Sequence, residues 1–245
     1  MTSELSIRGL RKSFAGRPVL SGVDLDVHAG EFVAVLGANG SGKSTVLRCA
    51  VGLQTPDAGT ISLAGDRAAM VFQQIHLVRR RTALDNVCAG ALGRLPLHRS
   101  LAPALFPAAL RAEAMACLDR VGLAGQAGDL AGKLSGGQQQ RVAIARALCQ
   151  RAKVILADEP VSALDPSAAE QVVSLLASLA GEGLAVAAVL HQPDLARRHA
   201  GRIVGLHEGR IVLDGPPPAI RESDLDVLYG HESRTPHPVA QSSGA

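Results

Sequence analysis

The chain has 245 residues, of which 47% are hydrophobic and 19% charged, and its 25 basic and 22 acidic side chains leave a formal net charge of +3. This length and hydrophobic content predict one compact domain with a sizeable core and exclude a disordered chain, while the weak net charge and the absence of tryptophan argue against a nucleic-acid partner. No apolar run reaches the ~20 residues of a membrane-spanning helix and the first residues lack a signal-peptide pattern, so we expect a soluble, intracellular protein.

The first predicted elements are strands. Apolar and polar residues alternate in Leu5–Ile7 and Val23–Val27, which predicts half-exposed antiparallel strands at the start of the chain. Phe32–Leu36 is instead a continuous apolar run that stops at Gly37, a pattern typical of a strand buried on both faces.

Residues 82–150 show no strand pattern. Two apolar stripes at helical spacing predict two amphipathic helices, and their members are Leu110, Ala114, Cys117, Leu118 and Val121 for the first and Val142, Ala145, Leu148 and Cys149 for the second. We therefore expect a helical subdomain inserted into an α/β core.

The α/β pattern returns after this insertion. Val154–Ala157 and Leu184–Leu190 are again continuous apolar runs, and Asp165 and Pro166 begin a helix between them whose apolar stripe consists of Val172, Leu175, Leu176 and Leu179. Buried strands separated by a helix predict a parallel sheet with right-handed crossovers. Near the end, Arg202–Leu206 and Arg210–Leu213 predict a hairpin.

A glycine-rich segment follows the first buried strand and opens an apolar helix. It fits the phosphate-loop (P-loop) pattern, with two glycines that bracket four residues before Lys-Ser, and runs through Gly37, Ala38, Asn39, Gly40, Ser41, Gly42, Lys43, Ser44 and Thr45. Glycines allow successive backbone N–H groups to turn toward phosphate oxygens, and the following helix contributes its positive end. Lys43 is then predicted to reach the β- and γ-phosphates, and Ser44 to bind Mg²⁺.

Two further segments carry candidate chemistry. Asp158 and Glu159 follow the buried strand Val154–Ala157, at the edge where ligands lie in open α/β sheets, and suit an Mg²⁺ site and a general base for water attack, respectively. Ser135, Gly136, Gly137 and Gln138 begin the second predicted helix of the insertion. Taken alone, Asp158 and Glu159 are typical of a solvated loop, and Ser135–Gln138 are typical of the start of an ordinary capped helix.

Leu134–Gln138, combined with the P-loop and the Asp-Glu strand, resembles the ATP-binding-cassette (ABC) family over about residues 5–229. The resemblance implies a P-loop NTPase (RecA-like) α/β core with an N-terminal antiparallel β subdomain and an inserted α-helical subdomain, and it implies ATP and Mg²⁺ as cofactors. It divides the chain into an ATPase domain at 1–230, with core segments 1–81 and 151–230 and the helical subdomain at 82–150, and a flexible tail at 231–245.

The resemblance also implies roles that spacing alone does not give. Gln73 is similar to the glutamine that senses Mg²⁺ and the γ-phosphate, Ser162–Asp165 to the loop that communicates across the dimer, and His191 to the switch histidine that contacts the γ-phosphate. Phe14 is similar to the aromatic that stacks on adenine. By pattern alone, His191 fits a structural histidine and Phe14 fits a residue of a strand core.

A narrower resemblance, to the ATPase subunits of phosphonate importers, is carried by Gln138–Arg146, Leu156–Pro160, Leu190–Gln192 and Arg202–Leu206. It implies a homodimer that lies peripherally on the cytoplasmic face of the inner (plasma) membrane, with transmembrane permease subunits and a periplasmic substrate-binding protein as separate chains and with no nucleic acid. The alternatives are an importer for phosphite, phosphate or amino acids, a soluble non-transport cassette ATPase, and a module that only binds nucleotide. An intact Glu159 and His191 argue against the last.

Overall fold

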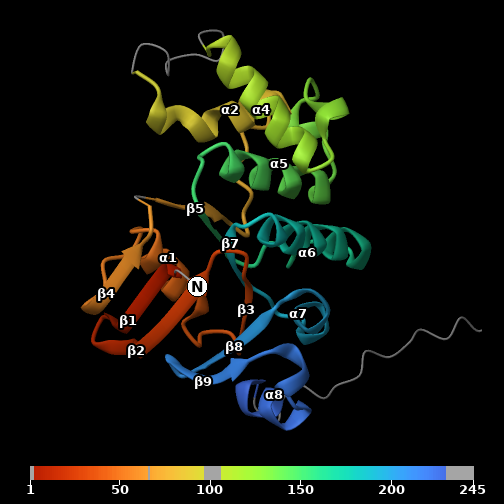
Figure 1. The fold of residues 1–245 in the computed structure, drawn as a ribbon. Coiled ribbons are helices and arrows are strands. Elements are labelled where there is room, and N and C mark those ends of the chain that lie inside the picture. Colours follow the sequence, from red (N-terminus) through yellow and green to blue (C-terminus); the bar gives the residue numbers. More distant parts are fainter. Residues whose placement is uncertain (1–2, 66, 97–105, 230–245) are drawn as a thin grey trace, which may run out of the picture.

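The protein is described here by a computed structural model, which covers residues 3–65, 67–96 and 106–229 (Figure 1). The expected tail at 231–245 lies outside the described residues. A three-stranded antiparallel sheet lies beside a six-stranded sheet, and a group of helices extends beyond one edge of the larger sheet, near β5 (Figure 1).

The smaller sheet contains the N-terminal strands. Its order is β2-β1-β4, with β1 at Ser3–Phe14, β2 at Arg17–His28 and β4 at Ala58–Leu63. Leu5 pairs with Val27 of β2, and both neighbours of β1 run antiparallel to it. The predicted antiparallel start is therefore confirmed, whereas β4 was not predicted because its exposed, glycine-containing sequence has no clear alternation.

The larger sheet forms the centre of the molecule. Its order is β5-β6-β7-β3-β8-β9, with β5 at Ala68–Val71, β6 at Val154–Ala157, β7 at Ala185–Val189, β3 at Phe32–Leu36, β8 at Arg202–His207 and β9 at Arg210–Gly215. All neighbours pair in parallel except β8 and β9, which form the predicted hairpin. The three continuous apolar runs form β3, β6 and β7 as predicted, and these strands are buried along their whole length, although Leu184 at the start of the third run is only partly buried.

The two faces of this sheet belong to two apolar clusters. Along β3, Ala34 and Leu36 face one cluster, whereas Val33 and Val35 face the other, as the two-residue period of a strand requires. The first cluster is closed by α5 (Gly136–Leu148), α6 (Pro166–Gly181) and α7 (Pro193–His199), and the second by α1 (Lys43–Ala50) and the small sheet. Parallel strands need this double cover because both of their faces are apolar.

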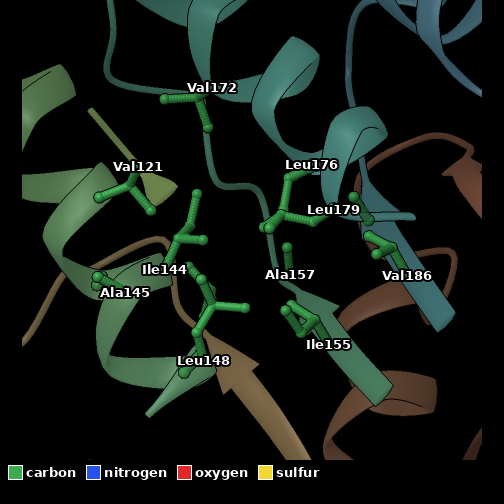
Figure 2. Packing of buried hydrophobic residues seen from close by; sticks show 14 of the residues in the cluster. Val121, Ile144, Ala145, Leu148, Ile155, Ala157, Val172, Leu176, Leu179 and Val186 are labelled. Carbon is green, nitrogen blue, oxygen red and sulfur yellow. The ribbon is translucent and has the colours of Figure 1, made fainter. Parts of the chain in front are cut away.

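The helical region after Thr82 shares the first cluster rather than forming a separate core. It contains α2 at Ala83–Cys88, α4 at Ala108–Arg120 and α5, with short 3-10 turns at Ala89–Arg94, Ala124–Gln126 and Ala131–Lys133. Figure 2 shows Ile144 and Leu148 of α5 pointing toward Ile155 of β6. Helix α5 therefore joins the outer helices α2 and α4 to the sheet.

Helix α6 begins as the sequence predicts. The Asp165 carboxylate accepts a hydrogen bond from the Ala168 backbone N–H at 2.9 Å, and Pro166 occupies the first turn. Its buried stripe differs from the predicted one at two positions, because Val173 is buried and Leu175 is only partly buried. Two short C-terminal elements, a 3-10 turn at Pro217–Ala219 and α8 at Glu222–Tyr229, were not predicted. Among the described residues, no helix combines the length and apolar character that crossing a membrane requires.

Candidate nucleotide-binding site

The P-loop connects the end of β3 to the start of α1, where the sequence places it. Gly37, Gly40 and Gly42 have φ values of 149°, 80° and 106°. A Cβ at Gly37 would lie 2.2 Å from the Leu206 carbonyl oxygen, and one at Gly42 would lie 2.7 Å from a methyl group of Leu20. The loop therefore requires glycine for backbone conformation and for space.

Lys43 is turned inward into this loop. Its Nζ donates hydrogen bonds to the carbonyl oxygens of Gly37 and Ala38, both at 2.8 Å, and the residue is only 4% exposed. Burial lowers the pKa of Lys43, and the nearby Glu159 and Asp158 carboxylates oppose that shift. The ammonium group is thus held at the place where a phosphate would approach the loop.

Ser41 offers a test of whether the loop fits an anion. Its hydroxyl is buried and has no hydrogen-bond partner among the described residues. A buried hydroxyl without a partner is costly, and a phosphate oxygen would accept a hydrogen bond from it. The loop chemistry therefore fits a phosphate group.

The carboxylate of Asp158 is connected directly to the start of α1. Ser44 Oγ donates to Asp158 Oδ1 at 2.6 Å, and Arg48 Nη2 lies 3.4 Å from Asp158 Oδ2. The backbone N–H of Asp158 donates to the Val71 carbonyl oxygen at 2.8 Å, which fixes the end of β6 against β5. A hydroxyl and a carboxylate held together are oxygen ligands of the kind that Mg²⁺ prefers.

Glu159 and His191 come from neighbouring strand ends. His191 Nε2 lies 2.8 Å from Glu159 Oε1, and both side chains are partly exposed. Glu159 has a φ of 51°, an uncommon value for a residue with a side chain, and its carbonyl oxygen accepts a hydrogen bond from Ser162 Oγ at 3.2 Å. Such strained backbone clusters at functional sites.

A cleft of about 280 Å³ opens over the loop. It is lined by Phe14, Val19, Asn39, Gly40, Gly42, Lys43, Ser44, Thr45 and Glu159. Phe14 is 43% exposed, so it is not a residue of the strand core, and Lys12 Nζ lies 5.3 Å from the centre of its ring. The structure therefore brings a cation, two hydroxyls, a carboxylate and an exposed aromatic ring to one place.

Gly37, Ala38, Ser41, Asp158 and His191 do not line this cleft, but they belong to the P-loop or contact a residue that lines it, whereas two further groups of predicted site residues lie elsewhere. Gln73 follows β5 and is exposed. Ser135–Gln138 form the start of α5, where the Ser135 hydroxyl accepts from the Gln138 N–H at 3.3 Å and the Gln138 side chain accepts from the Ser135 N–H at 2.9 Å. Ser135 and Gly136 are exposed and do not line the cleft, so within one chain the predicted site residues form two separate clusters, one at the P-loop and one at the start of α5.

Sequence reasoning missed two residues of the first cluster. Val19 lines the cleft from β2, and nothing in its strand pattern distinguishes it from a core residue. Arg48 contacts Asp158 because it lies one helical turn after Ser44, a spacing that was available in the sequence.

A glycine loop between a buried parallel strand and a helix, with paired carboxylates at the end of another parallel strand of the same sheet, defines a P-loop nucleotide-binding protein. Within this class, residues 20–162 match the family model described as ABC transporter. The chain belongs to this family of ATPases, whose ATP-binding subunits hydrolyse ATP to power transport. The expected family and fold class are confirmed.

Curated relatives cover nearly the whole chain. A phosphonates import ATP-binding protein of Nostoc sp. (strain PCC 7120) is 46% identical over 231 residues, which is 88% of this chain and 87% of the relative. One of Pseudomonas aeruginosa (strain UCBPP-PA14) is 44% identical over 257 residues, covering 96% of this chain and 92% of the relative. A hypophosphite import ATP-binding protein of Stutzerimonas stutzeri is 42% identical over 241 residues, covering 92% of this chain and 70% of the relative.

Solved structures agree with the fold. The dimeric post-hydrolysis state of an ATP-binding cassette bound to ADP and Pi is similar with a TM-score of 0.71 and 32% identity, over 88% of this chain and 100% of the other. A nucleotide-free ATP-binding cassette has a TM-score of 0.80 at 24% identity, over 93% and 95% of the two chains, which is a likeness of fold.

Proposed function

We propose that this protein is the ATP-hydrolysing subunit of an importer for phosphonate or a related oxyanion. The observation that carries the ATPase part is the arrangement of Lys43, Ser44, Asp158 and Glu159 around one cleft. The cargo part is supported by the relatives, which import phosphonates or hypophosphite by name and are 42–46% identical to this chain.

In the proposed mechanism, the P-loop from Gly37 to Thr45 binds the phosphates of ATP. Lys43 leaves the carbonyl oxygens of Gly37 and Ala38 and turns to the β- and γ-phosphates, and the unpaired Ser41 hydroxyl donates a hydrogen bond to a phosphate oxygen. Phe14 packs on the adenine ring, which its exposed position at the rim of the cleft favours. These contacts position the γ-phosphate near Glu159.

Glu159 is the proposed general base, which accepts a proton from the attacking water. His191, at 2.8 Å, holds the Glu159 carboxylate and contacts the γ-phosphate. Ser44, Asp158 and Gln73 are the proposed magnesium site, and a bound Mg²⁺ would neutralise the negative charge on the phosphates. Gln73 is exposed, so we propose that it approaches only when nucleotide is bound.

The second cluster, Ser135–Gln138, is proposed to complete the site of another chain. Its exposed helix start and its absence from the cleft of its own chain support a head-to-tail homodimer with two shared ATP sites. Dimeric cassettes of similar fold exist, and one holds ADP and Pi. Hydrolysis would then require the two chains to close on each other.

We further propose the surrounding assembly. Transmembrane permease subunits and a periplasmic substrate-binding protein are separate chains, and this subunit lies peripherally on the cytoplasmic face of the inner membrane. Within it, residues 82–150 form the helical subdomain and residues 1–81 and 151–230 the core. The shared apolar cluster around α5 supports a subdomain that moves together with the sheet rather than freely.

The test is transport by the assembled complex. The subunit is produced with candidate permease and substrate-binding chains from the same genome, reconstituted in vesicles, and assayed for ATP-dependent uptake of methylphosphonate, hypophosphite and phosphate. Uptake of methylphosphonate that Lys43→Ala abolishes supports the proposal. Preferential uptake of hypophosphite would identify the hypophosphite import relative as the better guide to the cargo, and ATP turnover without any uptake would favour a non-transport ATPase.

A further inference from the structure

One side chain of α5 holds the segment that carries Gln73. Arg146 Nη1 donates to the His76 carbonyl oxygen at 2.8 Å, and Arg146 Nη2 donates to the Ile75 carbonyl oxygen at 3.1 Å. A guanidinium group is a rigid, planar fork of N–H donors, so it can bind the carbonyl oxygens of two consecutive residues at once. Gln73 therefore lies two residues before a point of the backbone that is fixed to α5.

The backbone around Gln73 has few other hydrogen bonds. Among the described residues, no backbone–backbone hydrogen bond involves residues 73–77. Before this segment, the Val71 carbonyl oxygen accepts from the Asp158 N–H at 2.8 Å, and after it the Asn86 side chain binds both the N–H and the carbonyl oxygen of Val78. Between these two points, the backbone is bound by Arg146.

The conformation of this segment is one that needs support. His76 has a φ of 45°, in the left-handed region that residues with a side chain rarely adopt. Its ring packs against the edge of the Phe72 ring, with the ring centres 5.6 Å apart and the planes at 81°. Such a backbone persists only where surrounding contacts hold it. Because Arg146 binds the carbonyl oxygen of His76 itself, loss of the guanidinium should release the turn around Gln73.

Arg146 is in turn held firmly on its helix. A Cβ added at Gly90 would lie 2.2 Å from the Arg146 carbonyl oxygen and 3.3 Å from Arg146 Cγ, so the 3-10 turn at Ala89–Arg94 packs directly on this residue. About three turns earlier, the same helix begins at Ser135–Gln138, the cluster proposed to face the nucleotide of a partner chain. One helix thus connects that cluster to the segment of Gln73.

We propose that Arg146 is a positioning residue of the nucleotide site, which holds the segment behind Gln73 so that this side chain can reach the proposed magnesium site. The inference rests on the proposed role of Gln73 in that site. Arg146 does not line the cleft, so it acts through the backbone of Ile75 and His76 rather than by contact with nucleotide. Its loss should weaken binding of nucleotide with Mg²⁺ and leave binding without Mg²⁺ unchanged.

The variant Arg146→Met tests this in the full chain, because it keeps an unbranched stem against Gly90 and removes the donors. Calorimetry with a non-hydrolysable ATP analogue gives its Kd without Mg²⁺ and its Kd with Mg²⁺. We expect the ratio of these two values to fall about tenfold, the lower end of the range for losing a group that orients a metal ligand. Arg146→Lys, which can bind one of the two carbonyl oxygens, should recover part of the ratio. In a Gln73→Ala chain, Arg146→Met should cause no further fall, because both changes act on the same contact.

A spin label measures the hold on the segment directly and without nucleotide. The four cysteines are buried, so Gln74→Cys introduces an exposed thiol beside Gln73. The attached label should become more mobile in Arg146→Met and less so in Arg146→Lys. Arg141→Met is the matched control, because Arg141 Nη1 donates from the same helix to another carbonyl oxygen, that of Val121, at 3.3 Å. It should lower Tm and leave both the label mobility and the Kd ratio unchanged.

The inference is overturned if Arg146→Met leaves the mobility of the label unchanged, or if it leaves the Kd ratio unchanged while Gln73→Ala lowers that ratio. If Arg146→Met does not fold, Arg146→Lys decides by the same two measurements. An unchanged ratio in Gln73→Ala as well would remove Gln73 from the proposed magnesium site, and the inference would fail with it. Turnover by the wild-type chain that Lys43→Ala abolishes would in that case leave the proposed ATPase intact.

Discussion

Replacing Glu159 by glutamine separates nucleotide binding from hydrolysis. In the wild-type chain, His191 Nε2 lies 2.8 Å from the Glu159 carboxylate. Glutamine keeps the length of the side chain, and its amide oxygen can accept a hydrogen bond from the same nitrogen. The charge and the ability to take a proton are lost. If Glu159 is the general base, kcat should fall ~10²–10⁴-fold, which corresponds to about 2.7–5.4 kcal/mol in the activation free energy.

Binding of MgATP should not weaken in the same variant. Glu159 lines the cleft beside Lys43 and raises the pKa of that lysine, so its negative charge faces the place where the phosphates bind. Removing that charge removes repulsion toward an anionic ligand, and we expect an equal or lower Kd for MgATP. The closed dimer should accumulate, because bound ATP is no longer consumed.

The assay is single-turnover hydrolysis together with calorimetric binding of MgATP. Glu159→Ala also removes the contact with His191, so an equal loss of kcat in both variants would show that proton transfer and not side-chain positioning is affected. Glu182→Gln removes an exposed carboxylate at the end of α6 and should turn over normally. Turnover by Glu159→Gln within threefold of wild type would refute the assignment of the base.

Three further outcomes are expected. Lys43→Ala should bind ATP at least about 100-fold more weakly in calorimetry, because charge-assisted hydrogen bonds contribute about 1.5–3 kcal/mol each, and unchanged affinity would contradict the P-loop assignment. Mixing Lys43→Ala chains with Ser135→Arg chains should restore ATPase activity that neither variant has alone, because each mixed dimer keeps one intact shared site. If mixed dimers form but do not hydrolyse ATP, the result counts against the shared site. Glu113 accepts hydrogen bonds from Arg151 and Arg94, which lower the pKa of its carboxyl from the ordinary 4.5. Glu113→Gln should therefore lower the free energy of unfolding, measured with urea, by about 1 kcal/mol above pH 4.5 and by progressively less below it. A loss of stability that does not depend on pH would exclude these ion pairs as its cause.

The sequence predicts the site best where the chemistry is local. Residues 37–45 follow one buried strand and enter one helix, so a short pattern fixes both their conformation and their direction. Asp158 and Glu159 are equally local to the end of β6, and parallel pairing then brings them beside the P-loop. The buried strands were predictable for the same reason, because a continuous apolar run is a property of a few neighbouring residues.

Contacts between distant segments were not predictable from such patterns. The pairing of β4 with β1 joins residues 47 to 58 positions apart, from Arg11 with Ala58 to Leu5 with Leu63, and the sequence of Ala58–Leu63 does not alternate clearly enough to predict a strand. Likewise, Arg146 binds the carbonyl oxygens of Ile75 and His76, which lie 71 and 70 positions before it, and no local signal encodes that contact. The separation of Ser135 from the P-loop is a matter of tertiary arrangement, and it is what makes the second chain necessary in the proposed mechanism.

The two clusters of the site are nevertheless linked inside one chain. Cβ atoms added at Gly136 and Gly137 would lie 3.2 Å from a methyl group of Leu164 and 3.0 Å from the Cβ of Ala168, so the start of α5 packs closely on the segment that leads into α6. That segment begins at Glu159, whose strained backbone is held by Ser162. In the proposed dimer, a partner chain that binds nucleotide against the start of α5 would therefore press on the same short stretch of chain that carries Glu159, the proposed catalytic base. A residue with left-handed backbone angles has few alternative conformations, so a small shift of this stretch would rotate the Glu159 carboxylate. This coupling gives a physical reason for hydrolysis to begin only after both chains have closed.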